Sequence, residues 1–312
     1  MSTVDISGLD KAELLVALVN AARPLAPIHP VAALPDGLHQ VPDADYHQRA
    51  EGIISKGALD LVHRSPAHYR AWLDGATEED TPTLAFGRSF HCALLEPERF
   101  ARTHVELPDF GYLLKHDESG TTAEQGKANK ERRNAWRSAN AGMTWVEPAD
   151  WTRVVGMCES VRRHPLASRV LSGGAAEQTI RWTDPETGLV AKARADYVRL
   201  SHRMIADVKS CQDASREAFR RDVAKYRYHV QNALYRMGFQ ALKIPVEHFL
   251  FIAVEKEPPY AVAVYSLDAM SVERGVDAAR ADIATLAECV RTGRYPGYPQ
   301  TIQELDIPPW AA

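Results

Sequence analysis

The sequence predicts a mixed α/β fold, in which helices flank a central mixed β-sheet and a helical region precedes it. Residues 174–312 show the order strand, strand, strand, helix, helix, strand, strand, helix. Residues 44–173 instead carry mainly helical spacing of apolar residues. The chain has 312 residues and an ordinary share of charged residues, 25%, so we expect one globular domain over 44–312.

Residues 1–43 are expected to form a proline-rich arm in front of this domain. A short amphipathic helix over about 10–22 is followed by a stretch with five prolines. Proline lacks a backbone N–H, so this stretch cannot form a regular helix or a central strand. An extended arm or linker is the remaining interpretation.

The helical part, 44–173, is read from caps and apolar spacing. Ser55 can cap the first helix, and Ser65-Pro66 starts the second, because proline is accepted in the first helical turn. The expected helices are 56–64, one beginning at Pro66, one with helical spacing from Leu84 to Leu95, 122–138, 148–163, and a short one that ends at Gly173-Gly174.

The second part, 174–312, begins with alternating strand patterns. Residues 177–182 and 189–200 flank a polar turn and predict a hairpin. The further expected elements are a strand over 204–211, helices within 215–243 that break near Lys225, two strands on either side of Glu257-Pro258-Pro259, and a long helix over 268–291 that ends at Gly293.

Composition excludes several classes of protein. No apolar run approaches the roughly 18 residues that a membrane-spanning helix needs, so no membrane partner is expected. The N-terminal residues lack the basic segment of a secretory signal. The four cysteines are widely spread and form no C-x-x-C pair, which is typical of reduced thiols. These observations predict a cytoplasmic protein.

Charge is distributed unevenly along the chain. The formal net charge is −4, which by itself disfavours a polyanionic partner. Residues 214–243, however, carry a balance of +5, which leaves −9 on the remainder. Tyr226, Tyr228 and Tyr235 are interleaved with these bases. A basic, aromatic-bearing segment suits a nucleic-acid substrate, and a solvated basic helix fits the local pattern equally well.

Two consecutive predicted strands carry the residues with the strongest indication of chemistry. Asp207 and Lys209 are two positions apart in a strand, so both side chains face the same side. Asp196 lies near the end of the preceding strand, and the short turn can place it beside them. Two carboxylates next to a lysine predict a site for Mg²⁺, with Mn²⁺ as a substitute. Lys209 can orient or deprotonate the attacking water, or stabilise charge on a phosphate.

Four further residues are candidates on local grounds that leave alternatives open. Glu177 opens the hairpin, where it can bind the same ion or be a solvated charge. His91 lies one helical turn after Gly87 and is either a metal ligand or a boundary residue with one hydrogen bond. Gln231 and Tyr235 share a helix face, and can grip a phosphate or a base edge or form ordinary surface hydrogen bonds.

The order of these motifs resembles one family. GRSFH, EQTIRWTDPETGLVAKARADY, IADVKS and YHVQNALY follow one another as in the RecB-type branch of the PD-(D/E)XK nucleases, and they are most similar to its RecE-like exonucleases. The segment ISKGALDLVHRSPAHYRAWL resembles the opening of that group. The similarity runs from about Tyr46 to Trp310 and leaves residues 1–43 outside. It implies a PD-(D/E)XK nuclease core.

The resemblance implies catalytic roles for Asp196, Asp207 and Lys209. Asp196 would take the place of the family's "PD" aspartate, although Ala195 precedes it here in place of proline. Asp207 and Lys209 would be the (D/E)XK pair. The backbone carbonyl of Val208 would complete the metal ligands of this strand.

The resemblance also assigns the outer residues of the site. His91 would be the motif-one metal ligand, and Glu177 resembles an acidic residue that precedes the core hairpin in RecE-like members. Gln231 and Tyr235 would form the Q-x-x-x-Y motif, which contacts DNA. The basic segment adds the expected DNA-binding residues Arg216, Arg220, Lys225 and Arg227.

The family's activity implies a Mg²⁺-dependent exonuclease that degrades one strand of linear double-stranded DNA from the 5′ end. The 3′ overhang would then serve recombination by a single-strand annealing protein of the RecT type. Relatives assemble as homo-oligomeric rings around DNA, and a phage origin is also implied. The residues leave open an endonuclease or a 3′-directed nuclease on the same core, and a non-catalytic DNA-binding or assembly protein.

Overall fold

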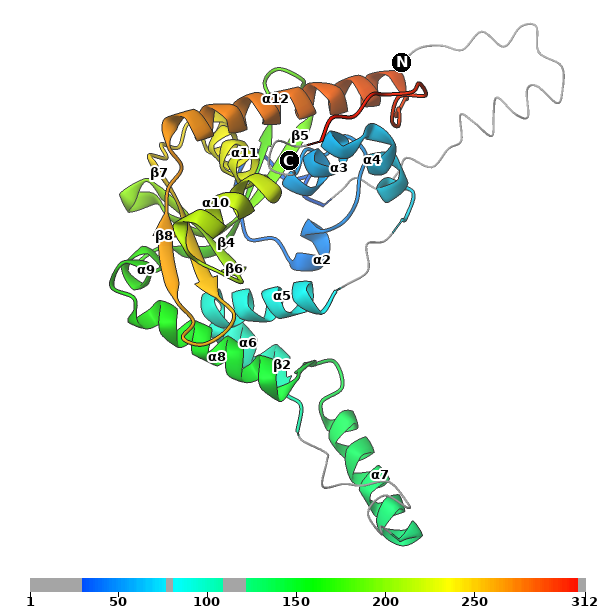
Figure 1. Ribbon diagram of the computed structural model, residues 1–312, viewed down its shortest axis with the longest axis vertical. Coiled ribbons are helices and arrows are strands. Elements are labelled where there is room, and N and C mark those ends of the chain that lie inside the picture. Colours follow the sequence, from blue (N-terminus) through cyan, green and yellow to red (C-terminus); the bar gives the residue numbers. More distant parts are fainter. Residues whose placement is uncertain (1–29, 77–80, 109–121, 308–312) are drawn as a thin grey trace, which may run out of the picture.

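The computed structural model describes residues 30–76, 81–108 and 122–307. Its centre is a six-stranded sheet in the order β1-β4-β5-β6-β7-β8, in which β6 and β7 run parallel and the other neighbouring pairs run antiparallel. The strands are β1 (Gly37–His39), β4 (Ala175–Thr183), β5 (Val190–Arg199), β6 (Met204–Cys211), β7 (His248–Glu255) and β8 (Val262–Tyr265). Figure 1 shows helices around this sheet, which confirms the predicted fold class.

The helices largely follow the sequence prediction. Ser55 caps α3 by accepting a hydrogen bond from the Ala58 N–H, and Gly293 ends α12 in the left-handed conformation. The α-helices are α2 (Asp43–Tyr46), α3 (Lys56–Arg64), α4 (Pro66–Leu73), α5 (Pro82–Leu95), α6 (Pro97–Thr103), α7 (Ala123–Ala139), α8 (Pro148–Arg163), α9 (Pro165–Val170), α10 (Arg216–Lys225), α11 (Tyr228–Ala241) and α12 (Ala269–Thr292).

The end of the predicted arm is attached to the sheet. Residues 37–39 form β1, which pairs with β4 at the edge of the sheet. An edge strand needs partners on one side alone, so the neighbouring prolines do not interrupt the sheet. The predicted helix over 10–22 lies outside the described residues.

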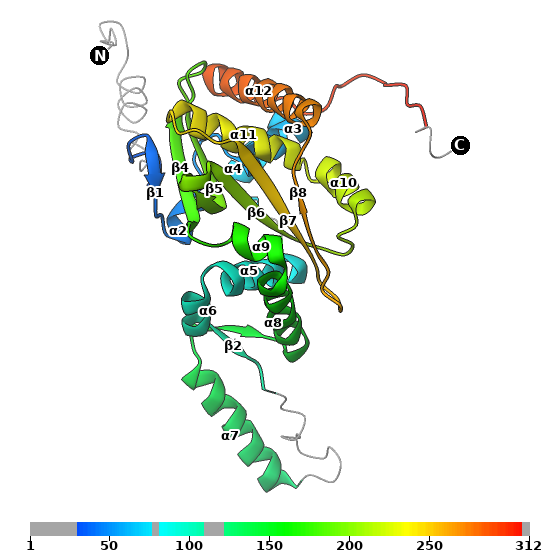
Figure 2. The ribbon, with the colours of Figure 1, turned by 90° about the vertical axis from the view of Figure 1, so that its left-hand side faces the viewer.

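Two apolar cores cover the two faces of the sheet. One core joins the sheet to α3, α11 and α12, with Trp182 and Phe251 among its fully buried side chains. The other joins it to α5, α8 and α9 through residues such as Phe90 and Met157. Figure 2 shows these two helical layers on opposite sides of the strands. The sheet therefore holds α5 and α11 at fixed positions on its two faces.

Close packing fixes α11 in particular. A Cβ atom built on Gly275 of α12 would lie 2.3 Å from the carbonyl oxygen of His229 in α11, so the two helices touch where glycine stands. This contact holds the first turns of α11 against α12. Those turns carry Gln231, one of the expected DNA-binding residues.

The helix α7 extends away from the rest of the molecule (Figure 1). The short parallel strands β2 (His104–Glu106) and β3 (Thr144–Val146) form its base. The basic helix predicted over 122–138 is thereby confirmed as a helix. No helix in the described part of the chain combines the length and the apolar run that a membrane span requires. All four cysteines are free and buried.

Candidate metal and active site

Three carboxylates lie in one row across β4, β5 and β6. The pairs on either side of Glu177 and Asp196 in the β4–β5 ladder place these two residues opposite each other. The β5–β6 ladder ends one pair short of Asp196 and Asp207, which are the next positions in the same register. The sheet therefore brings together the three acidic residues that the sequence predicted for the site.

The carboxylate of Asp196 lies where β5 and β6 separate. Its Oδ2 atom accepts a hydrogen bond from the backbone N–H of Val208 at 2.7 Å. A side chain thus takes the place of the strand carbonyl that would otherwise pair there. The separation leaves a gap into which other groups can reach.

Glu177 turns toward this gap through an unusual backbone conformation. Its φ is +51°, in the left-handed region that residues with a Cβ seldom occupy. Such strain persists only where the surrounding structure imposes it, and it is concentrated at functional sites. Here it accompanies a cluster in which ligand atoms of His91, Glu177 and Asp196 all lie within 4.8 Å of one another. His91 comes from α5, and its Nδ1 atom is 3.5 Å from Asp196 Oδ2.

Asp207 is fully buried on the other side of Asp196. Its Oδ1 atom accepts a hydrogen bond from Gln231 Nε2 at 2.6 Å, and the same amide donates to the Tyr235 hydroxyl at 3.2 Å. Its Oδ2 atom lies 2.6 Å from Lys209 Nζ as an ion pair but has no hydrogen bond of good geometry. Asp207 and Lys209 therefore face the same side, as their spacing predicted.

The electrostatics of this pair decide the charge of the lysine. Burial lowers the pKa of Lys209, but the carboxylates of Asp207 and Asp196 outweigh that effect and raise it. Burial raises the pKa of Asp207 to about 6, with Lys209 opposing and Asp196 reinforcing the shift. Lys209 is therefore a cation at neutral pH, which suits orientation of water and stabilisation of a phosphate rather than removal of a proton.

The residues fit a divalent cation. Burial, reinforced by Asp196, raises the pKa of Glu177 to about 8. Closely spaced carboxylates favour protonation unless a positive charge joins them, and a divalent ion supplies that charge. Carboxylate oxygens and an imidazole are ligands that Mg²⁺ and Mn²⁺ accept. The buried Asp207 Oδ2, which lacks a hydrogen bond, is one more oxygen beside this set.

The geometry places some of the predicted metal ligands inside the cluster and others beside it. Glu177, which had a solvated alternative, lies inside the cluster with His91 and Asp196. Asp207 lies beside the cluster, and both of its oxygens already face Gln231 or Lys209. Ligation by Asp207 and by the Val208 carbonyl stays a prediction.

The raised pKa of Glu177 predicts a pH-dependent stability of the metal-free protein. The folded chain keeps the proton up to about pH 8, whereas the unfolded chain releases it near the ordinary value of 4.5. Stability therefore falls as pH rises through this window. Glu177→Gln should raise the melting temperature in chelator at pH 9 and leave it unchanged at pH 4. Thermal melts check this, with the exposed Glu273→Gln as control; equal shifts in both variants would contradict it.

The expected DNA-binding residues divide into two groups. Arg216, Arg220 and Lys225 are exposed on α10, so their predicted contact with DNA stays open. Gln231 and Tyr235 are buried, and they hold Asp207 in place instead of lying on the surface. Their direct contact with DNA stays a prediction, and the structure adds a positioning role that the sequence did not indicate.

Arg227, the fourth basic residue expected to bind DNA, has partners within the fold. Its guanidinium donates to Asp60 at 2.9 Å and to Asp282, and its side chain is only 13% exposed. It joins the α10–α11 junction to α3 and α12. Its charge is paired within the fold, so the structure adds a structural role, and its contact with DNA stays a prediction.

The structural role of Arg227 can be tested by substitution. Arg227→Met should destabilise the fold by about 3 kcal/mol, because it removes the guanidinium from the largely buried Asp282, which keeps its contact with His63. Arg220→Met, at a residue that is 78% exposed, should leave stability nearly unchanged. Urea unfolding measures the stability of both variants. Comparable unfolding free energies would contradict the structural role of Arg227.

Sequence reasoning missed two residues beside the row. The guanidinium of Arg194 lies over the ring of Tyr46, 4.0 Å from its centroid. Arg194 is two positions before Asp196 on β5, so both side chains face the same side of the sheet. Burial, opposed by Arg194 and reinforced by Glu177, raises the pKa of Tyr46. The signal in the sequence was the alternation of Lys192 and Arg194 with alanines, four and two positions before Asp196 in the same strand.

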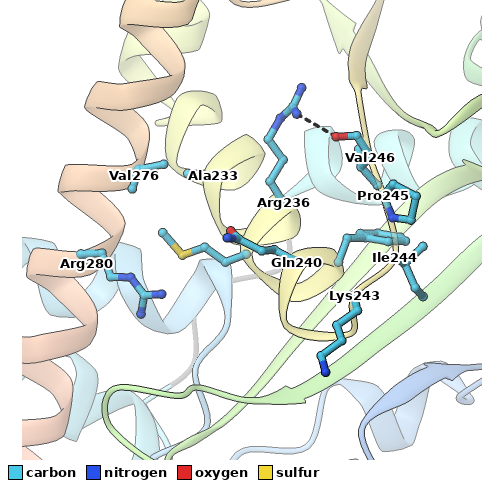
Figure 3. Close-up of a pocket in the computed structure, with 11 residues that line it drawn as sticks. Ala233, Arg236, Gln240, Lys243, Ile244, Pro245, Val246, Val276 and Arg280 are labelled. Atoms are coloured by element: carbon cyan, nitrogen blue, oxygen red, sulfur yellow. Dashed lines mark hydrogen bonds between the residues drawn. The ribbon is translucent and has the colours of Figure 1, made fainter.

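Two cavities lie near these elements. A cavity of about 490 Å³ is lined by Tyr46, Lys56 and Lys192 among others, and the Tyr46 ring also contacts the guanidinium of Arg194. Another, of about 530 Å³, lies between α11 and α12 (Figure 3). Among the described residues that line the second cavity there is no Asp or Glu. The first cavity, in contrast, shares Lys192 with β5, the strand that carries Asp196.

Comparison with solved structures places the fold. A protein from Eubacterium rectale, provisionally described as an exonuclease, matches with a TM-score of 0.51 and 13% identity over 84% of this chain and 97% of that chain. A phage-related exonuclease from Haemophilus somnus 129PT matches with a TM-score of 0.30 and 10% identity, over 62% of this chain and 99% of that one. At these identities the first similarity shows the fold alone.

No curated protein matches the chain. The family described as "PDDEXK-like domain of unknown function (DUF3799)" matches residues 55–306, which include His91, Glu177, Asp196, Asp207 and Lys209. The family and the fold support a nuclease of the PD-(D/E)XK superfamily, without singling out its RecE-like members. The chain is therefore a member of the DUF3799 family of PDDEXK-like domains.

Proposed function

We propose that this protein is a Mg²⁺-dependent exonuclease that hydrolyses phosphodiester bonds of linear double-stranded DNA. The observation that carries the proposal is the cluster of His91, Glu177 and Asp196 next to the Asp207–Lys209 pair. Carboxylates that converge beside a buried lysine are the arrangement required for metal-assisted phosphoryl chemistry. Membership of a PDDEXK-like family supports the same reaction class.

Mg²⁺ would be held by His91, Glu177 and Asp196, with Asp207 as a further oxygen ligand. When bound, the ion supplies Lewis acidity toward the phosphate and lowers the pKa of water. Mn²⁺ is expected to replace it, because both ions accept oxygen ligands and an imidazole. The protein contributes the fixed spacing of the ligands, which the β4–β5–β6 register determines.

The chain's own residues perform the remaining tasks. The Lys209 ammonium, held against Asp207, orients the attacking water and balances negative charge that develops on the phosphate. Gln231 keeps the Asp207 carboxylate in a fixed rotation. The cavity beside Tyr46 and Lys192 gives the DNA strand room next to the row. Arg216, Arg220 and Lys225 on α10 would contact its backbone phosphates.

The finer assignments are supported by the motif resemblance alone. They are degradation from the 5′ end, production of 3′ overhangs, and cooperation with a single-strand annealing protein of the RecT type in recombination. A homo-oligomeric ring around DNA belongs to the same set. Each of them depends on how DNA enters the site and what binds beside it.

One assay tests the proposal and its direction together. Linear duplex labelled at the 5′ or 3′ end and a closed circular duplex are incubated with the protein and Mg²⁺ or EDTA. We expect early loss of the 5′ label, a stable circle, and no digestion in EDTA. Cleavage of the circle would favour an endonuclease, and early loss of the 3′ label a 3′-directed enzyme. No cleavage with either ion would overturn the catalytic function and leave DNA binding or assembly.

A further inference from the structure

The ammonium of Lys209 has a second neighbour, to which the sequence assigned no role at the site. Its Nζ atom lies 4.6 Å from the ring centroid of Tyr228, over the face of the ring. On its other side the Asp207 carboxylate is 2.6 Å away. The cation is therefore enclosed between a carboxylate and an aromatic face. A cation over an aromatic face is attracted by the electron-rich ring, most strongly where water is excluded.

The ring of Tyr228 is itself fixed. It stacks on Phe251 of β7 with centroids 5.8 Å apart and an interplanar angle of 27°, and Tyr226 stacks on it at 5.6 Å. Phe251 is fully buried and pairs with Asp207 in the β6–β7 ladder. The strand that carries Asp207 thus also supports, through its neighbour, the ring that faces Lys209.

A helix break places Tyr228 at this position. It is the first residue of α11, and Arg227 before it has a φ of +55° and separates α11 from α10. Asp60 and Asp282 bind the Arg227 guanidinium and hold this conformation. In an uninterrupted helix each residue turns about 100° from the last, so the break redirects the side chain.

We propose that Tyr228 is a positioning residue that fixes the Lys209 ammonium between its ring and the Asp207 carboxylate for phosphodiester hydrolysis. This inference rests on the proposed function. The aromatic face, not the hydroxyl, is the acting group. Tyr228 restricts the ammonium to the side of Asp207, where it can meet a phosphate bound at the carboxylate row.

The first test separates the ring from the hydroxyl. Tyr228→Phe should keep kcat within about twofold, and Tyr228→Leu should lower kcat about tenfold with little change in KM. Tyr298→Leu, at an exposed tyrosine outside this stack, is the matched control and should keep kcat. A tenfold loss in Tyr228→Phe would assign the effect to the hydroxyl and overturn the proposal, as would normal kcat in Tyr228→Leu.

A second measurement does not depend on nuclease activity. The rate at which an amine-reactive reagent labels Lys209, followed by peptide mass spectrometry, should rise in Tyr228→Leu and stay unchanged in Tyr228→Phe and Tyr298→Leu. An unchanged rate in Tyr228→Leu would refute the contact even if the wild type proves inactive. Failure of the proposed function, in contrast, would appear as an inactive wild type with the same labelling pattern.

Ring-fluorinated phenylalanines at position 228 cover the case in which Tyr228→Leu does not fold. They keep the shape of the ring while weakening its electron-rich face. We expect kcat to fall progressively with fluorination. A flat series would overturn the proposal, because packing alone would then account for Tyr228.

Discussion

Replacing Lys209 by alanine is expected to abolish hydrolysis, with a loss in kcat of about 10²–10³-fold or more, while duplex binding stays largely intact. The reason is that this side chain is only 18% exposed and lies against the Asp207 carboxylate, not among the exposed basic residues of α10. Loss of the ammonium removes the group that we propose orients water and balances charge on the phosphate. Single-turnover digestion of linear duplex, combined with a binding titration, measures both effects.

Lys225→Ala provides the matched contrast. This lysine is exposed on α10, and its loss should weaken duplex binding and reduce its salt dependence, yet preserve turnover at saturating DNA. Thermal melts of both variants establish that they fold. Normal digestion by Lys209→Ala would remove this residue from the mechanism.

Asp196→Asn is expected to have the second largest effect, on metal binding. Loss of residues that only orient metal ligands typically costs 10–100-fold in affinity, and loss of a direct ligand should cost about 100-fold or more. Asn keeps an oxygen that can accept the hydrogen bond from the Val208 N–H, so the strand geometry is retained. Calorimetric titration with Mn²⁺ or Mg²⁺ measures the affinity, and digestion should fall in parallel.

Two comparisons sharpen this experiment. Asp213→Asn, at an exposed position after β6, should bind metal like the wild type. Asp207→Asn asks whether the carboxylate beside the cluster is also a ligand: a large loss supports ligation, and unchanged binding refutes it. If Asp196→Asn itself binds metal normally, the cluster with His91 and Glu177 is not the metal site.

Local sequence signals located most of the elements. The Ser55 cap and the Gly293 stop each act through hydrogen bonds or backbone freedom within a few residues, so they can be read without the fold. The two-residue spacing of Asp207 and Lys209 likewise predicted that they share a side, because strand geometry alternates strictly. The mixed sheet followed from the order of these elements.

The site was only partly accessible in this way. The sequence named Glu177, but not the left-handed backbone that turns it toward Asp196 and His91. It assigned Gln231 to DNA, which stays a prediction, but gave no sign that this amide also binds the carboxylate of Asp207, 24 residues earlier in the chain. Tyr228 opens the motif YHVQNALY and is one aromatic residue of a basic segment, but the sequence assigned it no role at the site, because its approach to Lys209 depends on the break at Arg227.

The sequence by itself determined the chemical inventory: which strands and helices form, which side chains can bind a cation, and that Asp207 and Lys209 lie side by side. Only the tertiary structure decided what each charge faces. Arg227 shows the difference, since its partners Asp60 and Asp282 are 167 and 55 residues away along the chain. Propensity and spacing act over a few residues, whereas burial and charge pairing are set by segments that meet only when the sheet and its helices pack.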